Sequence, residues 1–355
     1  MKHRVASSAN SGSSPSFHRF LGPTNFKIMK IKLLHIASSA LFLTIASGCY
    51  QDINLDKYKE QDGEHLLTIN SIVNPDSVVA ASATRTYFYS DAHTGKDFVK
   101  DLQLSLSVNG IDKGPMTFNP VNNLYESTCK PAENDVIELK TTYLGQSVEC
   151  RDTIPARVKI ESIEIERQGP MHIYFDDDYI ITYKITFTDP ANVDNYYFLH
   201  YNDVGPLMGN LNMGERDYTY EFVFQQLANH INAVVPGWEP YSPWGLPFTD
   251  YGIDGTTHTL VVKELVTDYY PLAGVGMMKR NIKLYSISRS YYLYLLSRLY
   301  NYNIDGGLHG GMIDLGVTEP IKFYSNIDGG IGILGSYSLD AVEIDAIKIL
   351  GPFPK

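Results

Sequence analysis

The sequence lacks several features that would assign a function directly. Its 355 residues include three cysteines and two tryptophans, and it has no apolar stretch of the ~20 residues that a membrane-spanning helix needs. No G-x-S-x-G elbow, P-loop or set of kinase motifs occurs. Basic residues are outnumbered, with 29 Lys and Arg against 40 Asp and Glu. Because an acidic surface repels a phosphate backbone, nucleic acid is a poor candidate partner.

The longest apolar run, Leu33–Ala46, follows two lysines and leads through small residues to Cys49. Basic, apolar and small-residue parts in this order are typical of a secretory signal. The small residues at 46–48 are similar to a bacterial lipobox, with Ala46 in place of the usual leucine. We therefore predict a signal peptide over 29–48 and lipidation of the Cys49 thiol. A free cysteine behind an ordinary signal is the alternative.

The residues around this signal predict no fold of their own. Residues 1–28 contain no acidic residue and precede a complete signal, so we interpret them as an extension from a misassigned start. From residue 49 onward the chain has 23 basic and 40 acidic residues, a net charge of −17. Residues 49–65 are polar and predict a tether. The remaining length is enough for two ordinary domains.

Cys129 and Cys150 are the two cysteines left after Cys49, and each ends a predicted strand. An isolated pair in an exported protein favours a disulfide, which would stabilise the fold by roughly 3 kcal/mol through loop closure. Two buried free thiols on neighbouring strands are the alternative, and the sequence leaves it open. No metal site and no cofactor are predicted, because the histidines and cysteines do not follow a metal-ligand spacing.

Residues 66–156 consist of short alternating segments. Turn signals separate them, such as Asn74–Ser77 and the hairpin sequence Asn109–Gly114, and none has a helical period. Period-two alternation at this spacing favours an antiparallel β-sandwich of the immunoglobulin or transthyretin kind.

Residues 157–355 predict a larger β-rich domain, so the whole chain is expected to be mainly β. Between about 206 and 251 the pattern is irregular and rich in Pro, Gly and aromatic residues. At Tyr292, Leu295, Leu296 and Leu299 the period changes to i, i+3, i+4 and i+7, which predicts one helix at about 288–301, with a serine as its N-cap. The strand-like segments are 158–166, 173–190, 194–203, 258–266, 281–287, 321–325, 330–338 and 341–349.

Two stretches of the second half resemble a known family. LYSISRSYYLYLLSRLY (284–300) and EPIKFYSNIDGGIGILGSYS (319–338) are similar to the carboxy-terminal signature of the Bacteroidota lipoproteins labelled domain of unknown function 4249. VNG (108–110), NNLYES (122–127) and TIP (153–155) follow the same family's layout. The resemblance implies an outer-membrane lipoprotein that assists a TonB-dependent receptor in nutrient uptake. It assigns no catalytic residues.

The candidate contact region is Pro236–Phe248, which holds both tryptophans among prolines. Aromatic rings held by rigid prolines lose little entropy on binding, and they can stack on a sugar or pack against a protein. The alternative is that this segment caps the open end of a sheet. Its candidate contact residues are Trp238, Tyr241, Trp244 and Phe248.

Other motifs favour structural interpretations. GIGILG (330–335) has the spacing of a dinucleotide-binding loop, but strands flank it, so close backbone approach explains the glycines better. The acidic run at 176–178 could offer oxygen ligands to calcium. However, consecutive strand residues point to opposite faces, which favours a solvated turn.

The sequence therefore predicts a non-enzymatic outer-membrane lipoprotein that binds a TonB-dependent receptor, or that receptor's glycan or peptide ligand. One alternative is a glycan hydrolase that uses carboxylates such as Asp250 and Asp254 or those at 176–178. Another is an adhesin or assembly component with a sheet edge that accepts a partner strand. The acidic residues after Cys49 leave the cell surface and the periplasmic face both open as its location.

Overall fold

The computed structural model describes residues 65–87, 97–171, 178–204, 215–232, 245–266, 279–304 and 322–345. The chain divides into two compact units, Met1–Gln61 and Asp62–Lys355, and the described residues belong to the second. The predicted signal peptide and Cys49 lie outside the described residues. Of the helices in those described ranges, none has both the length and the apolar character needed to cross a membrane.

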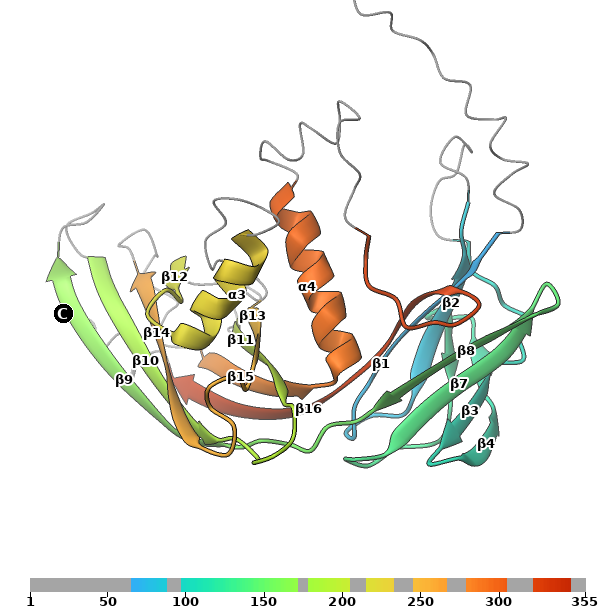
Figure 1. Ribbon diagram of the computed structural model, residues 1–355, viewed down its shortest axis with the longest axis horizontal. Helices are drawn as coiled ribbons and strands as arrows, with labels where there is room; N and C mark the ends of the chain where they lie inside the picture. The colour runs from blue at the N-terminus through green and yellow to red at the C-terminus, as the bar shows by residue number, and fades with distance from the viewer. Residues whose placement is uncertain are drawn as a thin grey trace, which may run out of the picture. The chain divides into compact units, whose positions relative to one another are not determined.

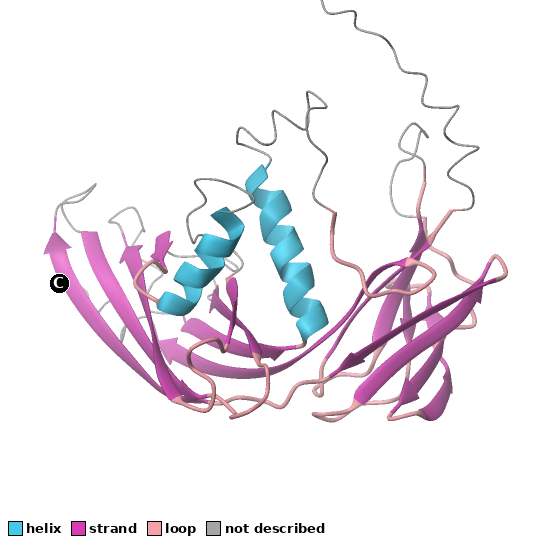
Figure 2. Cartoon of the chain, in the orientation of Figure 1, coloured by secondary structure: helices cyan, strands magenta, loops and turns pink. Residues whose placement is uncertain are grey.

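Three β-sheets and two helices make up the described part of the second unit (Figures 1 and 2). The first eight strands are β1 (Leu67–Val73), β2 (Ala80–Arg85), β3 (Ser105–Val108), β4 (Ile111–Pro115), β5 (Thr117–Asn119), β6 (Leu124–Glu126), β7 (Val136–Tyr143) and β8 (Gln146–Thr153). The other strands are β9 (Ile160–Met171), β10 (Asp178–Thr188), β11 (Tyr196–Val204), β12 (Glu215–Asp217), β13 (Leu246–Thr249), β14 (Thr257–Val266), β15 (Lys279–Ile287) and β16 (Ile331–Asp345). The helices are α3 (Phe222–Asn232) and α4 (Arg289–Ile304). The predicted mainly β fold is confirmed.

The sheets differ in size and order. The largest has eight strands in the order β13-β11-β15-β16-β1-β2-β6-β5. The two four-stranded sheets have the orders β12-β14-β10-β9 and β4-β3-β7-β8. Strands from both halves of the chain therefore share the eight-stranded sheet.

The amino-terminal strands form the predicted sandwich. Residues of β1, β2 and β6 share one hydrophobic core with residues of the sheet β4-β3-β7-β8. Every second residue of β7 is buried, among them Ile137 and Leu139, as the period-two alternation predicts. Asn109 and Gly110 join β3 to β4 with φ angles of 53° and 74°. Two consecutive positive φ angles are what a two-residue hairpin turn requires, so the predicted hairpin is confirmed.

The last strand of the described residues, β16, completes this sandwich. β16 runs parallel to β1, with Ile331 opposite Thr68, and its Leu334 is buried in the sandwich core. Its other edge pairs antiparallel with β15. The predicted division at 156/157 falls between the two hydrophobic cores, but the eight-stranded sheet connects them.

Glycines let the β16 backbone approach β1 closely. A Cβ atom on Gly332, where φ is +117°, would lie 2.0 Å from the carbonyl oxygen of Ile69. A Cβ on Gly330 would lie 2.7 Å from the carbonyl oxygen of Leu67. No real Cβ tolerates such contacts. The glycines of GIGILG therefore serve backbone packing, and the motif continues as a strand instead of opening a helix.

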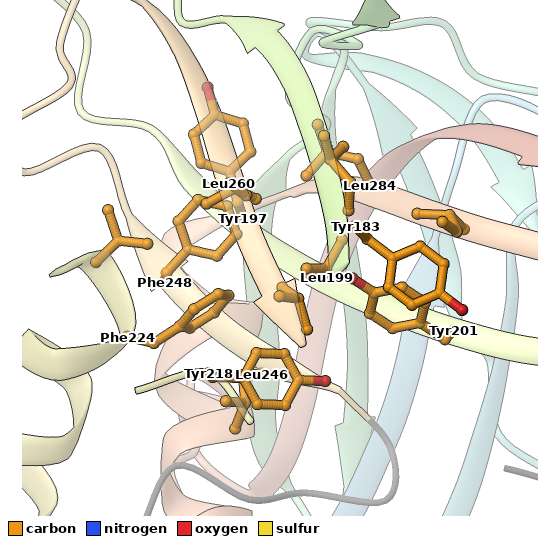
Figure 3. Packing of buried hydrophobic residues seen from close by; sticks show 14 of the residues in the cluster. Tyr183, Tyr197, Leu199, Tyr201, Tyr218, Phe224, Leu246, Phe248, Leu260 and Leu284 are labelled. Carbon is orange, nitrogen blue, oxygen red and sulfur yellow. The ribbon is translucent and has the colours of Figure 1, made fainter. Parts of the chain in front are cut away.

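The second core lies between the sheet β12-β14-β10-β9 and the strands β11, β13 and β15 (Figure 3). Tyr183, Tyr197 and Tyr201 are each at most 1% exposed. The ring centroids of Tyr183 and Tyr201 lie 5.6 Å apart, and the rings are tilted by 54°. Tilted aromatic pairs contribute about 0.5–1.5 kcal/mol beyond the area they bury. Aromatic packing thus holds the two layers together.

Helix α4 confirms the predicted helix and ends slightly beyond the predicted boundary. The Ser288 side chain caps it by accepting a hydrogen bond from the Tyr291 N–H at 3.2 Å. Leu295, Leu296 and Leu299 are buried, as the helical spacing indicates.

Two predictions for the second half are wrong. Helix α3 lies inside the region predicted to be irregular, where its opening Phe-Val-Phe has low helix propensity and tertiary packing of Val223, Phe224 and Leu227 decides the outcome. Residues 322–327 include most of the predicted strand 321–325 but form no strand. There the Asn326 side chain bonds both the N–H and the C=O of Leu334 in place of a backbone partner.

The contact between Gly332 and Ile69 predicts a large cost for the substitution Gly332→Ala. The added methyl group forces β16 away from β1, so we expect the free energy of unfolding to fall by at least about 2 kcal/mol. Gly114→Ala is the matched control, because Gly114 also has a positive φ but no atom lies within 4 Å of its virtual Cβ. It should cost about 1 kcal/mol. If urea denaturation gave equal losses of unfolding free energy for the two variants, the close approach of β16 to β1 would not contribute to stability.

Candidate functional site

The structure describes one of the four predicted contact residues, Phe248. Trp238, Tyr241 and Trp244 lie outside the described residues. Phe248 is 1% exposed, and its ring stacks on Tyr197 with 5.1 Å between centroids (Figure 3). Phe248 as a contact residue is therefore a wrong prediction. β13 pairs with β11 through this residue, which places its ring inside the second core.

Three carboxylates lie together where loops leave the second core. Asp189 follows β10, Asp250 follows β13, and Asp254 lies in the turn before β14. One carboxylate oxygen of each lies within 4.8 Å of the others. Among the described residues this acidic trio is the group that could hold a metal ion. The hydrolase hypothesis paired Asp250 with Asp254 but missed Asp189, which only the fold brings next to them.

Each carboxylate of the acidic trio accepts at least one hydrogen bond. Both oxygens of Asp189 accept, one from the Tyr197 hydroxyl and the other from the Gly255 N–H at 3.0 Å. Asp250 accepts from the Asn195 N–H at 2.7 Å. Asp254 accepts from the Asn192 N–H at 2.8 Å. The trio thus ties the loop after β10 to the turn before β14.

The environment of Asp250 raises its affinity for a proton. Partial burial raises the pKa of Asp250, and the nearby carboxylates of Asp189, Asp194 and Asp254 raise it further, while the bond from Asn195 opposes the shift. Asp189 itself is 2% exposed. A calcium ion takes six to eight oxygen ligands. Because both oxygens of Asp189 already accept bonds, the trio fits loop bracing better than cation binding or acid–base catalysis.

A second buried polar group joins four strands. Glu264 on β14 accepts hydrogen bonds from Arg280 on β15 and, at 2.9 Å, from the Tyr183 hydroxyl on β10. Arg216 on β12 lies 3.6 Å from the same carboxylate and stacks over the Tyr201 ring at 4.7 Å. All three charged side chains are at most 5% exposed. Removing one member would leave a buried charge uncompensated, which costs several kcal/mol.

The predicted disulfide does not form. Cys129 and Cys150 are free thiols, because Cys150 lies on β8 opposite Leu139, whereas Cys129 follows β6 and its carbonyl accepts the Val79 N–H. Burial raises the pKa of the Cys150 thiol to about 12, which keeps it protonated and unreactive. The thiols are free, as the alternative expected, but Cys129 is only partly buried and lies outside the strands.

Asp152 links the two halves of the chain. Its carboxylate accepts a hydrogen bond from the Ser336 hydroxyl at 2.7 Å, which joins β8 to β16. Burial raises the pKa of Asp152 to about 6, although bonds from Ser288, Ser336 and Ser290 and from the Thr153 backbone oppose the shift. Sequence reasoning gave no signal for this contact, because its partners are far apart in the chain.

A family model matches most of the chain. The model of the domain of unknown function DUF4249 matches residues 52–341. The chain belongs to the DUF4249 family. The family label that the resemblance suggested is thereby confirmed, and the match includes both halves of the fold and the GIGILG stretch. No curated protein matches this DUF4249 chain.

The acidic trio predicts that Asp189→Ala destabilises this DUF4249 protein by about 1–3 kcal/mol, because the buried Tyr197 hydroxyl and the Gly255 N–H lose their acceptor. Asp254→Ala is the control, since Asp254 is exposed and its loss should cost less than about 1 kcal/mol. Added calcium should leave the Tm of the wild-type protein unchanged. A calcium-dependent rise in Tm that Asp254→Ala abolishes would instead identify the trio as a cation site.

The raised pKa of Asp152 predicts a pH-dependent difference from Asp152→Asn. A carboxyl group whose pKa is higher in the folded state than in the unfolded state stabilises the fold at any pH below its unfolded-state pKa. This stabilisation is lost as the pH rises through the folded-state pKa. Relative to the variant, the wild-type free energy of unfolding should fall by about 2 kcal/mol between about pH 4.5 and pH 7.5. Urea denaturation of the wild-type protein and the variant at each pH measures this difference in unfolding free energy. A difference that stays constant with pH would refute the assignment.

Proposed function

We propose that this DUF4249 protein is a non-enzymatic, lipid-anchored component of the outer membrane that binds a partner of a TonB-dependent uptake system. The carrying observation is the order of its amino-terminal parts: a signal-like run, Cys49, and a compact unit that begins at Asp62. The polar composition of residues 49–65 predicts a tether, and a flexible chain of this length would reach on the order of 20 Å. An anchored unit on so short a tether stays close to the membrane proteins around it.

A binding role, as opposed to a catalytic one, is supported by what the buried and clustered polar groups do. The acidic trio accepts backbone and tyrosine hydrogen bonds that fix two loops. The Glu264 carboxylate is 0% exposed and bonded to Arg280. Carboxylates engaged in this way are poorly placed to exchange protons with a substrate, which acid–base catalysis requires.

The proposal is tested by purifying the tagged, lipidated protein from its native outer membrane after crosslinking and identifying what comes with it. A TonB-dependent receptor in stoichiometric amount is the expected result. Cys49→Ala is the control: without the lipid the protein should leave the membrane fraction and recover far less receptor.

Two results would contradict the proposal. The first is recovery of the lipidated protein alone, with no receptor above the level seen for Cys49→Ala. The second is turnover of a glycan by the purified protein that Asp250→Asn abolishes while the fold is retained. That outcome would move the assignment to a surface glycan hydrolase.

A further inference from the structure

The described part of the three sheets has six edge strands: β13, β5, β12, β9, β4 and β8. Edge strands expose backbone groups that can pair with another chain, and most proteins shorten or cover them. β5, β12 and β13 have three or four residues, and β4 contains Gly114 and Pro115. β8 is partly covered, because Glu149 and Asp328 exchange two backbone hydrogen bonds. β9, with twelve residues, is the longest of these edge strands, and on its outer side it pairs with no described strand, although its first residue, Ile160, donates its N–H to the Asp340 side chain of β16.

The two faces of β9 differ in chemistry. Ile163 and Ile165 lie opposite the fully buried Ile185 and Tyr183 of β10, but they are only partly buried themselves. The second core therefore ends at β9 with apolar side chains still in contact with solvent. One more strand at this edge would complete their burial, which is favourable because it removes apolar surface from water.

The opposite face of β9 is acidic. Glu164 and Glu166 are exposed, and Glu164 lies opposite Lys184 of β10. The Lys184 ammonium bonds Glu166, and both glutamates raise the pKa of Lys184. Two carboxylates thus share one lysine. Two copies of β9 would bring glutamates against glutamates, which disfavours pairing of the protein with itself.

We propose that β9 accepts an extended segment of a partner protein as an added strand, and that this segment alternates apolar and basic residues. Backbone hydrogen bonds to the β9 edge supply affinity, and alternate side chains supply specificity. The apolar residues cover Ile163 and Ile165, and the basic residues lie beside Glu164 and Glu166. This inference does not depend on the proposed uptake role.

The probe is a fluorescent peptide of about nine residues that alternates isoleucine and lysine, long enough to span most of a strand. Fluorescence anisotropy with the whole protein measures its dissociation constant. Two matched peptides carry glutamate in place of lysine, or the lysine sequence with N-methyl groups on alternate backbone nitrogens. We expect the lysine peptide to bind, the glutamate peptide to bind about ten-fold more weakly, and N-methylation to abolish binding.

The charge reversal Glu164→Lys with Glu166→Lys should invert this preference, so that the glutamate peptide binds better. Glu149→Lys is the control, because Glu149 is an exposed glutamate of another edge strand and pairs with Lys140 at 2.8 Å. It should leave the preference unchanged. Absence of binding, equal binding of the two charge types, or binding that survives N-methylation would each overturn the proposal, the last by indicating adsorption to an acidic surface.

Discussion

The parallel pairing of β1 with β16 joins the first and last strands of the described fold, and both hydrophobic cores depend on it. β16 contributes Leu334 to the sandwich core and Ile344 to the second core. Its Ser336 and Ser338 hydroxyls donate hydrogen bonds to the connection between the halves, at the carbonyl oxygens of Thr153 and Pro155. Displacing this one strand would open two cores at once, because no other described strand lies between β1 and β15.

Buried polar groups in this fold mainly connect strands and loops to one another through hydrogen bonds and ion pairs. Glu264 and Arg280 connect two strands of different sheets, and Asp189 connects two loops. Such groups add little net stability over apolar residues of the same size, but a wrong arrangement leaves charges unpaired. They therefore select one packing of the layers. In the same way, Asp250 and Asp254, the carboxylates considered for catalysis, already accept hydrogen bonds from backbone N–H groups.

The sequence predicted features that are set by neighbouring residues. The alternation of β7, the Asn109–Gly110 turn and the spacing of leucines in α4 each arise within about fifteen residues, so local patterns identify them. It also predicted the role of the glycines in GIGILG, because flanking strands exclude a nucleotide-binding turn. These are cases in which local preference and the final fold agree.

The remaining features depend on contacts between distant residues. Periodicity cannot tell which sheet a strand joins, which is why Cys129 and Cys150 were expected to meet and do not. Asp189 joins Asp250 and Asp254 only after β10 and β13 are in place. Helix α3 forms from a segment with aromatic and β-branched residues because its buried face packs on the second core. Phe248 was predicted to be a contact residue because composition does not show which side of β13 is covered.

The position of β16 also sets the order in which the protein can fold. Ile327 and Leu334 belong to the core of the amino-terminal sandwich, yet the ribosome adds them more than about 170 residues after the end of β8. The first-made half therefore emerges with an incomplete core and an open edge at β1. Such intermediates aggregate readily, and contacts between distant residues form slowly. The nascent chain thus has a long interval in which a chaperone can hold it unfolded, and the sandwich core is completed only after β16 has been released.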